Sequence, residues 1–144
     1  MQIPFWKKLS LPGIVVGAVV DVVGTNIWGL ALVTVLIVFH HLIGHPQAEM
    51  LSQIHHWLSD DPWVIFLNYV IGGAFTLLGG YVAAVIAKHN EVLNGGSASF
   101  LCIVFVLCTA GSLPLWQILL AIVFNPLVGM LGGYLRLRQT REVL

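Results

Sequence analysis

Asp21 is the side chain whose position most requires a chemical explanation, because it is the one Asp, Glu, Lys or Arg inside a long apolar stretch. An acid within the apolar core of a membrane costs about 3 kcal/mol on insertion scales and indicates a functional site by default. Buried there, it needs a proton or a partner, and three polar residues in or beside other apolar stretches qualify: Asn68, Asn125 and Arg136. The alternative is a structural carboxyl group, hydrogen-bonded to Thr25 one turn further along or to a neighbouring helix. The first interpretation predicts a proton or cation site.

Asn125 and Pro126 are adjacent near the centre of the last apolar stretch. Proline lacks the backbone N–H that a helix needs and disfavours helical geometry in the residue before it, so this step predicts an interruption of the helix. Interrupted helices line the binding sites of some transporters. Together with Asp21, the step supports the hypothesis of a small proton or cation transporter or channel. A simple kink is the alternative.

Histidines are concentrated in one region, and their spacing raises metal ligation as another chemistry. Five of the six lie close together in the sequence: His40, His41, His45, His55 and His56. His41 and His45 have the i, i+4 spacing that places two imidazoles on one helical face, as in metal sites. Pro46 opposes this arrangement because it biases His45 away from helical geometry. A Zn, Cu or haem site built from His41, His45, His55 and His56 is therefore a further hypothesis, and polar residues at a membrane surface are the alternative.

The composition places all of these residues in a membrane protein. The chain of 144 residues is 58% hydrophobic and only 8% charged, whereas soluble domains are about half apolar and a quarter charged. So few charged side chains cannot cover a soluble globule, which excludes a soluble enzyme. The formal net charge of +0 also excludes a basic nucleic-acid-binding domain.

Four apolar stretches approach or exceed the roughly 20 residues that a helix needs to cross a bilayer. They predict an all-α membrane protein, a single domain over residues 1–144, with four transmembrane helices at about 11–39, 63–87, 96–113 and 115–135. Uninterrupted apolar runs lack the alternation of a lipid-facing strand. Residues 46–58, between the first two spans, have apolar side chains on one side only, and they predict a short amphipathic helix in the outer interface.

The positive charges predict the topology, because Lys and Arg are retained on the cytoplasmic side of a membrane. With four spans, all six fall on the same side: Lys7, Lys8, Lys88, Arg136, Arg138 and Arg141. The opposite side has Glu49, Asp60 and Asp61 instead. Both termini are therefore predicted to be cytoplasmic.

Small residues recur at helical spacing in three of the predicted spans, which indicates faces where helices approach closely. The glycines of these faces are Gly13, Gly17 and Gly24 in the first span, Gly72 and Gly80 in the second, and Gly129 and Gly133 in the fourth. Such faces pack the helices of one chain or join copies of it. The string LGGY also occurs twice, at 78–81 and 131–134, through either duplication or independent use of an interfacial Tyr.

Two segments combine glycines with sparse charge: GAVVDVVGT at 17–25 and GGYVAAVIAKHNEVLNGGSASF at 79–100. They resemble sequences of small, uncharacterised bacterial four-helix membrane proteins, in which a G-x-x-x-D-x-x-G-[ST] stretch opens the first helix. One departure is Val85, where such proteins often have a basic residue, so that Lys88 is the only charge anchoring that turn. The resemblance implies a bacterial inner-membrane protein and no particular activity.

Three classes of function follow from these patterns. The chain has no motif for a nucleophile, a phosphate-binding loop or paired catalytic carboxylates. The leading expectation is a non-enzymatic membrane protein without a cofactor, whose partners are the lipid bilayer and either further copies of itself or another membrane protein. Proton or cation transport through Asp21 and the Asn125–Pro126 step is the alternative. Metal or haem binding at the outer histidines is the third class.

Overall fold

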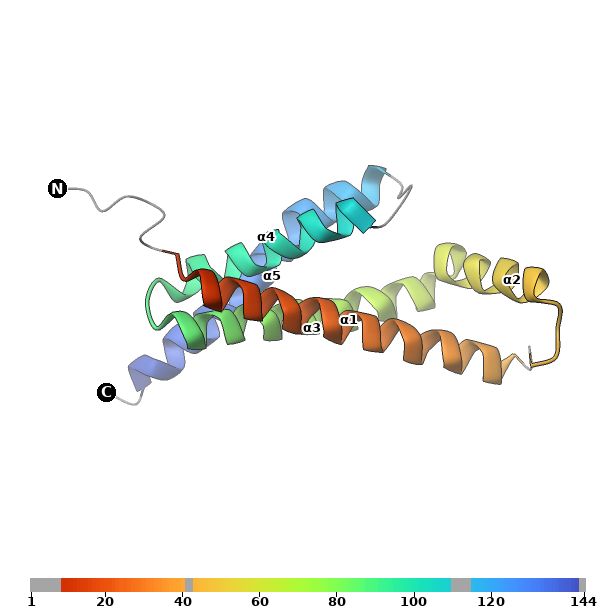
Figure 1. Ribbon diagram of the computed structural model, residues 1–144, viewed down its shortest axis with the longest axis horizontal. Coiled ribbons are helices and arrows are strands. Elements are labelled where there is room, and N and C mark those ends of the chain that lie inside the picture. The colour runs from red at the N-terminus through yellow and green to blue at the C-terminus, as the bar shows by residue number, and fades with distance from the viewer. Residues whose placement is uncertain (1–8, 41–42, 110–114, 143–144) are drawn as a thin grey trace.

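The computed structural model describes residues 9–40, 43–109 and 115–142, and within these ranges it has five α-helices and no strand. The helices are α1 (Leu11–Phe39), α2 (Gln47–Asp60), α3 (Pro62–Ala87), α4 (Glu91–Thr109) and α5 (Leu115–Glu142). The start of α1, the α3–α4 turn and the end of α5 lie at one end of the molecule, called the turn end below, and α2 lies at the other end (Figure 1). The predicted all-α class is confirmed.

Three helices are long and apolar enough to cross a membrane: α1, α3 and residues Ile118–Glu142 of α5. α4 is shorter, with an apolar segment at Glu91–Phe105. Large apolar side chains are exposed along these helices, Leu30, Phe66 and Phe100 among them. Such a surface suits hydrocarbon rather than water, and helices satisfy their own backbone hydrogen bonds there. The structure therefore has three candidate spans among its described residues, where the sequence predicts four.

Polar side chains cap the starts of α1 and α3. Asp61 Oδ1 accepts hydrogen bonds from the backbone N–H of Trp63 at 2.8 Å and of Val64 at 3.0 Å. Ser10 Oγ accepts from the N–H of Gly13 at 3.4 Å. These oxygens satisfy N–H groups that the first turn of a helix leaves without a partner. Asp61 is also the only residue between α2 and α3. α2 corresponds to the helix predicted at 46–58, with slightly later bounds.

Two helices extend beyond the spans predicted within them, and the predicted end of the third span near residue 113 lies outside the described residues. α4 begins at Glu91 rather than near residue 96, so Gly95 and Gly96 lie inside the helix. Both glycines are buried, and their lack of side chains gives α5 room to pack against them. α5 continues to Glu142 rather than ending near residue 135, and Arg138 Nε donates to Glu142 at 2.8 Å in its last turns. Polar pairs at i, i+4 spacing support a helix beyond its apolar stretch.

The interruption predicted at Asn125–Pro126 is wrong. α5 is helical from Leu115 to Glu142 with Pro126 inside it. Proline removes one backbone N–H, but a membrane helix tolerates this where neighbouring helices pack around the site. α4 supplies such packing, because Gly96 lies against the carbonyl group of Pro126. The structure thus contains, among its described residues, no broken helix of the kind that lines transporter sites.

The helices form two antiparallel pairs, α1 with α3 and α4 with α5, and glycines set the distance within the first. A Cβ on Gly17 would lie 2.5 Å from the carbonyl oxygen of Gly79, and one on Gly13 would lie 2.7 Å from that of Ala83. Real side chains do not approach so closely, and small residues let membrane helices bring their backbones together. The second pair diverges from the first on leaving the turn end (Figure 1).

Glycines also join α5 to its two neighbours. A Cβ on Gly129 would meet Ser99 Oγ of α4, and one on Gly133 would meet the carbonyl group of Glu91. On α3, a Cβ at Gly80 would likewise meet the backbone of Gly129. These three predicted glycines therefore lie at contacts between helices of a single chain.

The last two predicted glycines differ from each other. Gly24 lies against the ring of Phe75, but nothing lies within 4 Å of a Cβ built on Gly72. Gly72 therefore makes no close helix contact within the described part of one chain, and its predicted role in packing stays a prediction. It lies in the half of α3 that runs toward α2, where the two helix pairs have separated (Figure 1).

Candidate functional site

Asp21 lies inside the contact between α1 and α3. Because these helices are antiparallel, each turn forward along α1 meets one turn back along α3. Gly17 packs on Gly79, and one turn further Asp21 faces Thr76. Only 5% of Asp21 and 4% of Thr76 are exposed. The packing of the two helices thus buries a carboxyl group together with a hydroxyl group.

Three side chains contact the carboxyl group of Asp21. The hydroxyl of Thr76 lies 3.2 Å from its Oδ1, and the hydroxyl of Thr25 lies 3.4 Å from the same oxygen. The thiol of Cys102, on α4, lies beside this carboxyl group and donates to the carbonyl oxygen of Ala18 at 3.5 Å. Asp21 is therefore the point at which α1, α3 and α4 are joined by polar contacts.

Thr76 has two acceptors within reach but only one hydroxyl proton to donate. Its Oγ1 lies 3.2 Å from Asp21 Oδ1 and 3.2 Å from the carbonyl oxygen of Gly72. If Asp21 is ionised, Thr76 can donate to it. If Asp21 is protonated, the carboxyl group can donate to Thr76, which then donates to Gly72. The same arrangement of helices therefore satisfies either charge state of the carboxyl group.

The sequence predicts three partners for Asp21 on other helices: Asn68, Asn125 and Arg136. None of them contacts Asp21 in the described part of the chain. Asn68 instead accepts a hydrogen bond from the indole N–H of Trp28 at 3.2 Å and is exposed. Asn125 and Arg136 are half-buried on α5, which is not the helix packed on Asp21. The hydrogen bond with Thr25 agrees with the alternative prediction of a structural carboxyl group. The contacts of Asp21 with Thr76 and Cys102 were not predicted from the sequence. Thr76 is detectable as a member of the small-residue face of α3, but its pairing depends on the helix register.

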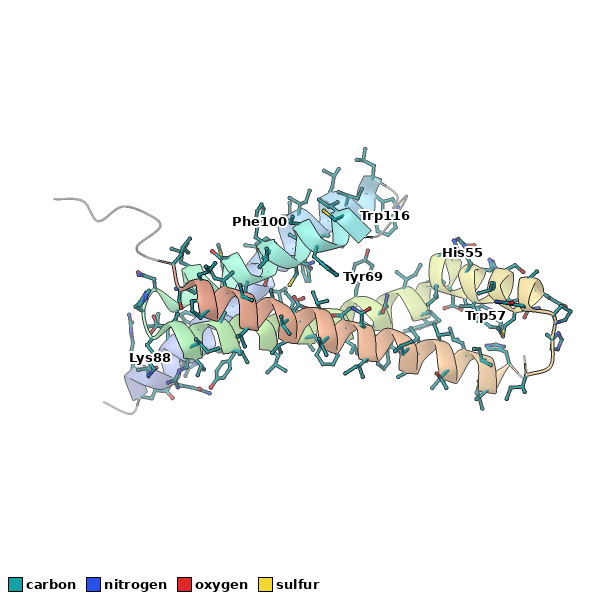
Figure 2. The ribbon with its side chains drawn as sticks, viewed as in Figure 1. His55, Trp57, Tyr69, Lys88, Phe100 and Trp116 are labelled. Atoms are coloured by element: carbon teal, nitrogen blue, oxygen red, sulfur yellow. The ribbon has the colours of Figure 1, made fainter. Side chains whose placement is uncertain are left out.

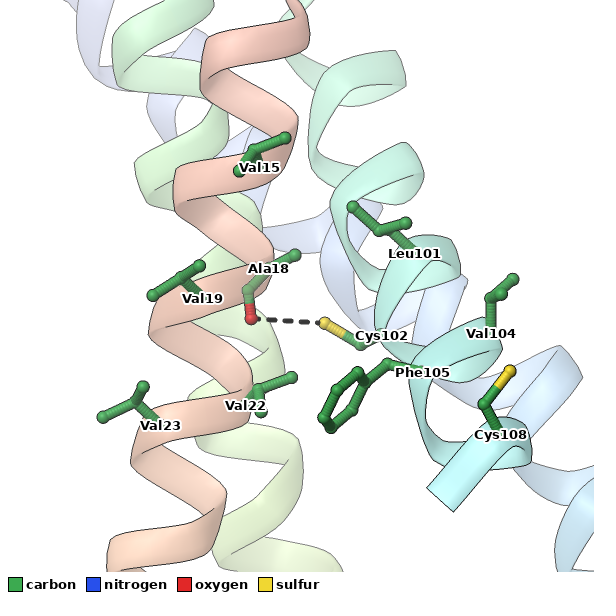
Figure 3. Close-up of a pocket in the computed structure, with 10 residues that line it drawn as sticks. All are labelled: Val15, Ala18, Val19, Val22, Val23, Leu101, Cys102, Val104, Phe105 and Cys108. Atoms are coloured by element: carbon green, nitrogen blue, oxygen red, sulfur yellow. Dashed lines mark hydrogen bonds between the residues drawn. The ribbon is translucent and has the colours of Figure 1, made fainter. Parts of the chain in front are cut away.

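A groove of about 460 Å³ lies between α1 and α4 (Figure 3). Valines dominate its α1 wall, and Phe105 and the thiol of Cys102 extend toward α1 from α4. The lining residues are Val15, Ala18, Val19, Val22, Val23, Leu101, Cys102, Val104, Phe105 and Cys108. Asp21 is not among them, so its carboxyl group does not line the groove. A surface of this composition accommodates apolar chains or helices, not ions.

Asn94 fastens the turn end of the molecule and was not identified from the sequence. It is fully buried. Its Oδ1 accepts from the backbone N–H of Ser10 at 2.7 Å, and its Nδ2 donates to the carbonyl oxygens of His89 at 2.9 Å and Asn90 at 3.1 Å. One amide therefore ties the start of α1 to the turn between α3 and α4.

The histidines do not converge in the part of the chain that is described. His45 precedes α2 and lies 3.6 Å from Glu49, and His56 Nδ1 lies 2.7 Å from Asp60 Oδ2. His55 lies 3.4 Å from the hydroxyl of Ser59, and Figure 2 shows it on α2, at the end of the molecule opposite Lys88. His41 lies outside the described residues.

Within the described ranges, no group of three or more His, Cys, Asp or Glu residues is placed to hold a metal ion. Each described histidine of the proposed set has instead a polar neighbour one turn along the chain. His40 differs, because its ring stacks on the indole of Trp57 with centroids 3.8 Å apart. This ring contact fastens the end of α1 to α2. No family model, curated protein or solved structure matches this chain.

Proposed function

We propose that this protein is a non-enzymatic, multi-pass protein of the bacterial inner membrane, with four spans and both termini in the cytoplasm. α4 is the fourth span. Its 19 residues correspond to about 28 Å of helix, close to the roughly 30 Å of the hydrocarbon core. The topology is supported by the basic residues, because Lys88 and the arginines of α5 lie toward the turn end, opposite the acids of α2.

The function of the protein is to associate with itself within the bilayer. The groove between α1 and α4 is the main observation in support of this proposal. It is open and apolar, has a volume of about 460 Å³, and is not filled by any described part of the chain. In lipid, helices associate through close packing and polar contacts between them. A second copy seated there gains packing that the single chain lacks.

The buried polar residues of the described chain support a structural role. They are Asp21, Thr76, Asn94 and Ser99. Each hydrogen-bonds to its own chain: Asp21 to Thr76, Asn94 to the backbone of Ser10, and Ser99 to the backbone of Gly95. A carboxyl group held by hydroxyl and thiol groups joins helices without any substrate.

The test is the oligomeric state of the purified protein in lipid nanodiscs and in proteoliposomes. We expect a discrete oligomer whose population rises with the ratio of protein to lipid. A monomer at every ratio contradicts self-association. If that monomer is always purified with one other membrane protein, the protein is instead an accessory subunit of that partner.

Proton transport is a second candidate function, and the hydroxyl of Thr76 is the observation that favours it. Because Thr76 can donate to Asp21 or to Gly72, the carboxyl group can gain and lose a proton with little rearrangement. Intramembrane acids in hydrogen-bonded chains form proton relays in pumps and transporters.

Proton flux into proteoliposomes that contain a pH-sensitive dye tests this second candidate. Transport through Asp21 requires flux that is lost in Asp21→Asn, which cannot release a proton, and reduced in Thr76→Val. Thr34→Val is a matched control, because it removes from the same helix a hydroxyl that donates only to the backbone of Leu30, and it should leave the flux unchanged. Flux that is equal in the wild type and in Asp21→Asn excludes the relay.

A further inference from the structure

Asn26 is a polar side chain in the middle of the 29-residue helix α1, and it is exposed on the surface of the molecule. An amide has two N–H donors and an oxygen with two lone pairs. One N–H of Asn26 donates to the carbonyl oxygen of Val22 at 2.7 Å. Within the described part of the chain, the second N–H and the amide oxygen have no partner. In hydrocarbon, such groups favour a partner on another helix.

The other exposed polar side chain of α1 does not require a partner in this way. Thr34 has a single hydroxyl proton, and it donates this proton to the carbonyl oxygen of Leu30 at 2.8 Å. Bonding of this kind satisfies Ser and Thr within their own helix. Asn26 is therefore distinguished by unused hydrogen-bonding capacity rather than by polarity alone.

Asn26 also lies on the same face of α1 as the wall of the groove. At about 100° per residue, Val15, Val19, Val22 and Asn26 fall within about 60° of arc. The first three line the groove, so Asn26 continues that face one turn toward α2. Leu30, which is 72% exposed, follows on the same side. We call the surface formed by Val15, Val19, Val22, Asn26 and Leu30 the α1 stripe.

We propose that the α1 stripe is the interface with a second copy of this chain, and that the two Asn26 amides hydrogen-bond to each other across a two-fold axis. This inference rests on the self-association proposed above and specifies where it occurs. A two-fold axis pairs each residue near it with its own counterpart. An amide suits that pairing, because it can donate to and accept from an identical amide.

The orientation of the pair follows from the topology. Both copies insert into the bilayer in the same direction, so the two-fold axis is parallel to the membrane normal and the two α1 helices are parallel. The valines of each copy then fill part of the groove of the other. A lipid chain could fill the groove but offers no donor or acceptor to Asn26.

Disulfide cross-linking in proteoliposomes tests the position of the interface. Cys102 and Cys108, the two native cysteines, are first replaced by alanine, and single cysteines are then introduced on α1. We expect Val19→Cys and Leu30→Cys to form disulfide-linked dimers on oxidation. Ala31→Cys and Val35→Cys are matched controls, because both are exposed but lie on the opposite side of α1, and we expect them to remain monomeric.

Variants of Asn26 test the amide pair. We expect Asn26→Val to raise the dimer dissociation constant roughly three- to tenfold, the range for a hydrogen bond between membrane helices. Asn26→Gln retains an amide and should recover part of the affinity, and Thr34→Val should have no effect. Since Asn26 is exposed, the unfolding of each variant should match that of the wild type, which separates weak association from misfolding.

The possible outcomes distinguish this inference from the proposed function. Dimers that cross-link through Ala31→Cys or Val35→Cys overturn the α1 stripe and leave self-association intact. Cross-linking at the expected positions with Asn26→Val no weaker than Thr34→Val overturns the amide pair. A monomer at every protein-to-lipid ratio overturns both proposals.

Discussion

The hydroxyl oxygen of Thr76 lies 3.2 Å from the carboxyl oxygen of Asp21, across the contact between α1 and α3. The pair lies one helical turn from the place where Gly17 packs on Gly79. Close backbone approach at the glycines brings the next turn of each helix within reach of short polar side chains. The glycines and the buried polar pair therefore form one structural unit.

Removal of this polar pair should show energetic coupling. We expect Thr76→Val to lower the free energy of unfolding by about 1–3 kcal/mol, because it leaves a buried carboxyl group without one hydrogen bond. In a double-mutant cycle with Asp21→Val, the effects should be non-additive by about 0.5–3 kcal/mol. Denaturant titration in mild detergent, followed by circular dichroism, measures both. Thr34→Val combined with Thr76→Val is the control pair, and its effects should be additive. Additive effects of Asp21→Val and Thr76→Val would contradict the contact between Asp21 and Thr76.

Glycine variants should separate close helix contacts from open positions. Gly17→Ala places a Cβ 2.5 Å from a backbone oxygen, and we expect it to destabilise the protein by about 1–3 kcal/mol through overpacking. Gly72→Ala adds a Cβ with no neighbour within 4 Å and should stabilise α3 by about 0.5–1 kcal/mol. Unfolding in the same detergent compares the two. A shift in the same direction for both would contradict the packing described for α1 and α3.

Asn94→Ala should loosen the turn end of the molecule. The substitution removes the acceptor of the Ser10 N–H and the donor to His89 and Asn90, at a cost of about 1–3 kcal/mol for buried groups left unpaired. Hydrogen exchange should become faster at Ser10 and in the first turn of α1. Asn68→Ala removes an exposed amide instead, so unchanged exchange at Ser10 is expected there.

Lys88 ends α3 in a left-handed conformation with φ of 58°, which favours glycine. Lys88→Gly should therefore raise the free energy of unfolding by about 1 kcal/mol relative to Lys88→Ala. Both variants lose the same charge, so their difference reports the backbone alone. Equal stability of the two variants would show that the turn relaxes to another conformation.

The proposed topology predicts which residues a membrane-impermeant thiol reagent can reach in intact cells. In a protein whose native cysteines are replaced, Gln53→Cys on α2 should react from outside. Gln139→Cys, near the end of α5, should react only after the inner membrane is opened. Labelling of Gln139→Cys in intact cells would require an odd number of spans or the reverse orientation.

Most of the helical architecture could be predicted from the sequence, because apolar length and helix capping are local properties. Local rules failed where packing opposed them. The third span was predicted to begin near Gly96, and Pro126 was predicted to interrupt the fourth, yet α4 begins five residues earlier at Glu91 and α5 continues through Pro126. Both sites are contacts between α4 and α5, and the packing gained there outweighs a poor local preference for helix.

The repeated LGGY string shows a similar limit. Gly79 faces α1 and Gly80 faces α5, whereas Gly132 faces α3 and Gly133 faces α4. In α3 the first glycine, Gly79, contacts the antiparallel partner helix α1. In α5 it is the second glycine, Gly133, that contacts the antiparallel partner helix α4. Identical letters have different neighbours, because the rotation of a helix about its axis is set by all the helices around it.

The sequence by itself determined that this is an all-helical, apolar chain whose single acid within a long apolar stretch is Asp21. Those facts depend on composition and on spacing along one segment. Only the tertiary structure decided that Thr76 and Cys102 lie beside Asp21, that the predicted glycines other than Gly72 pack within one chain, and that Asn26 is left exposed. Each of these depends on which turn of one helix meets which turn of another, and that register is fixed by packing between segments far apart in the sequence.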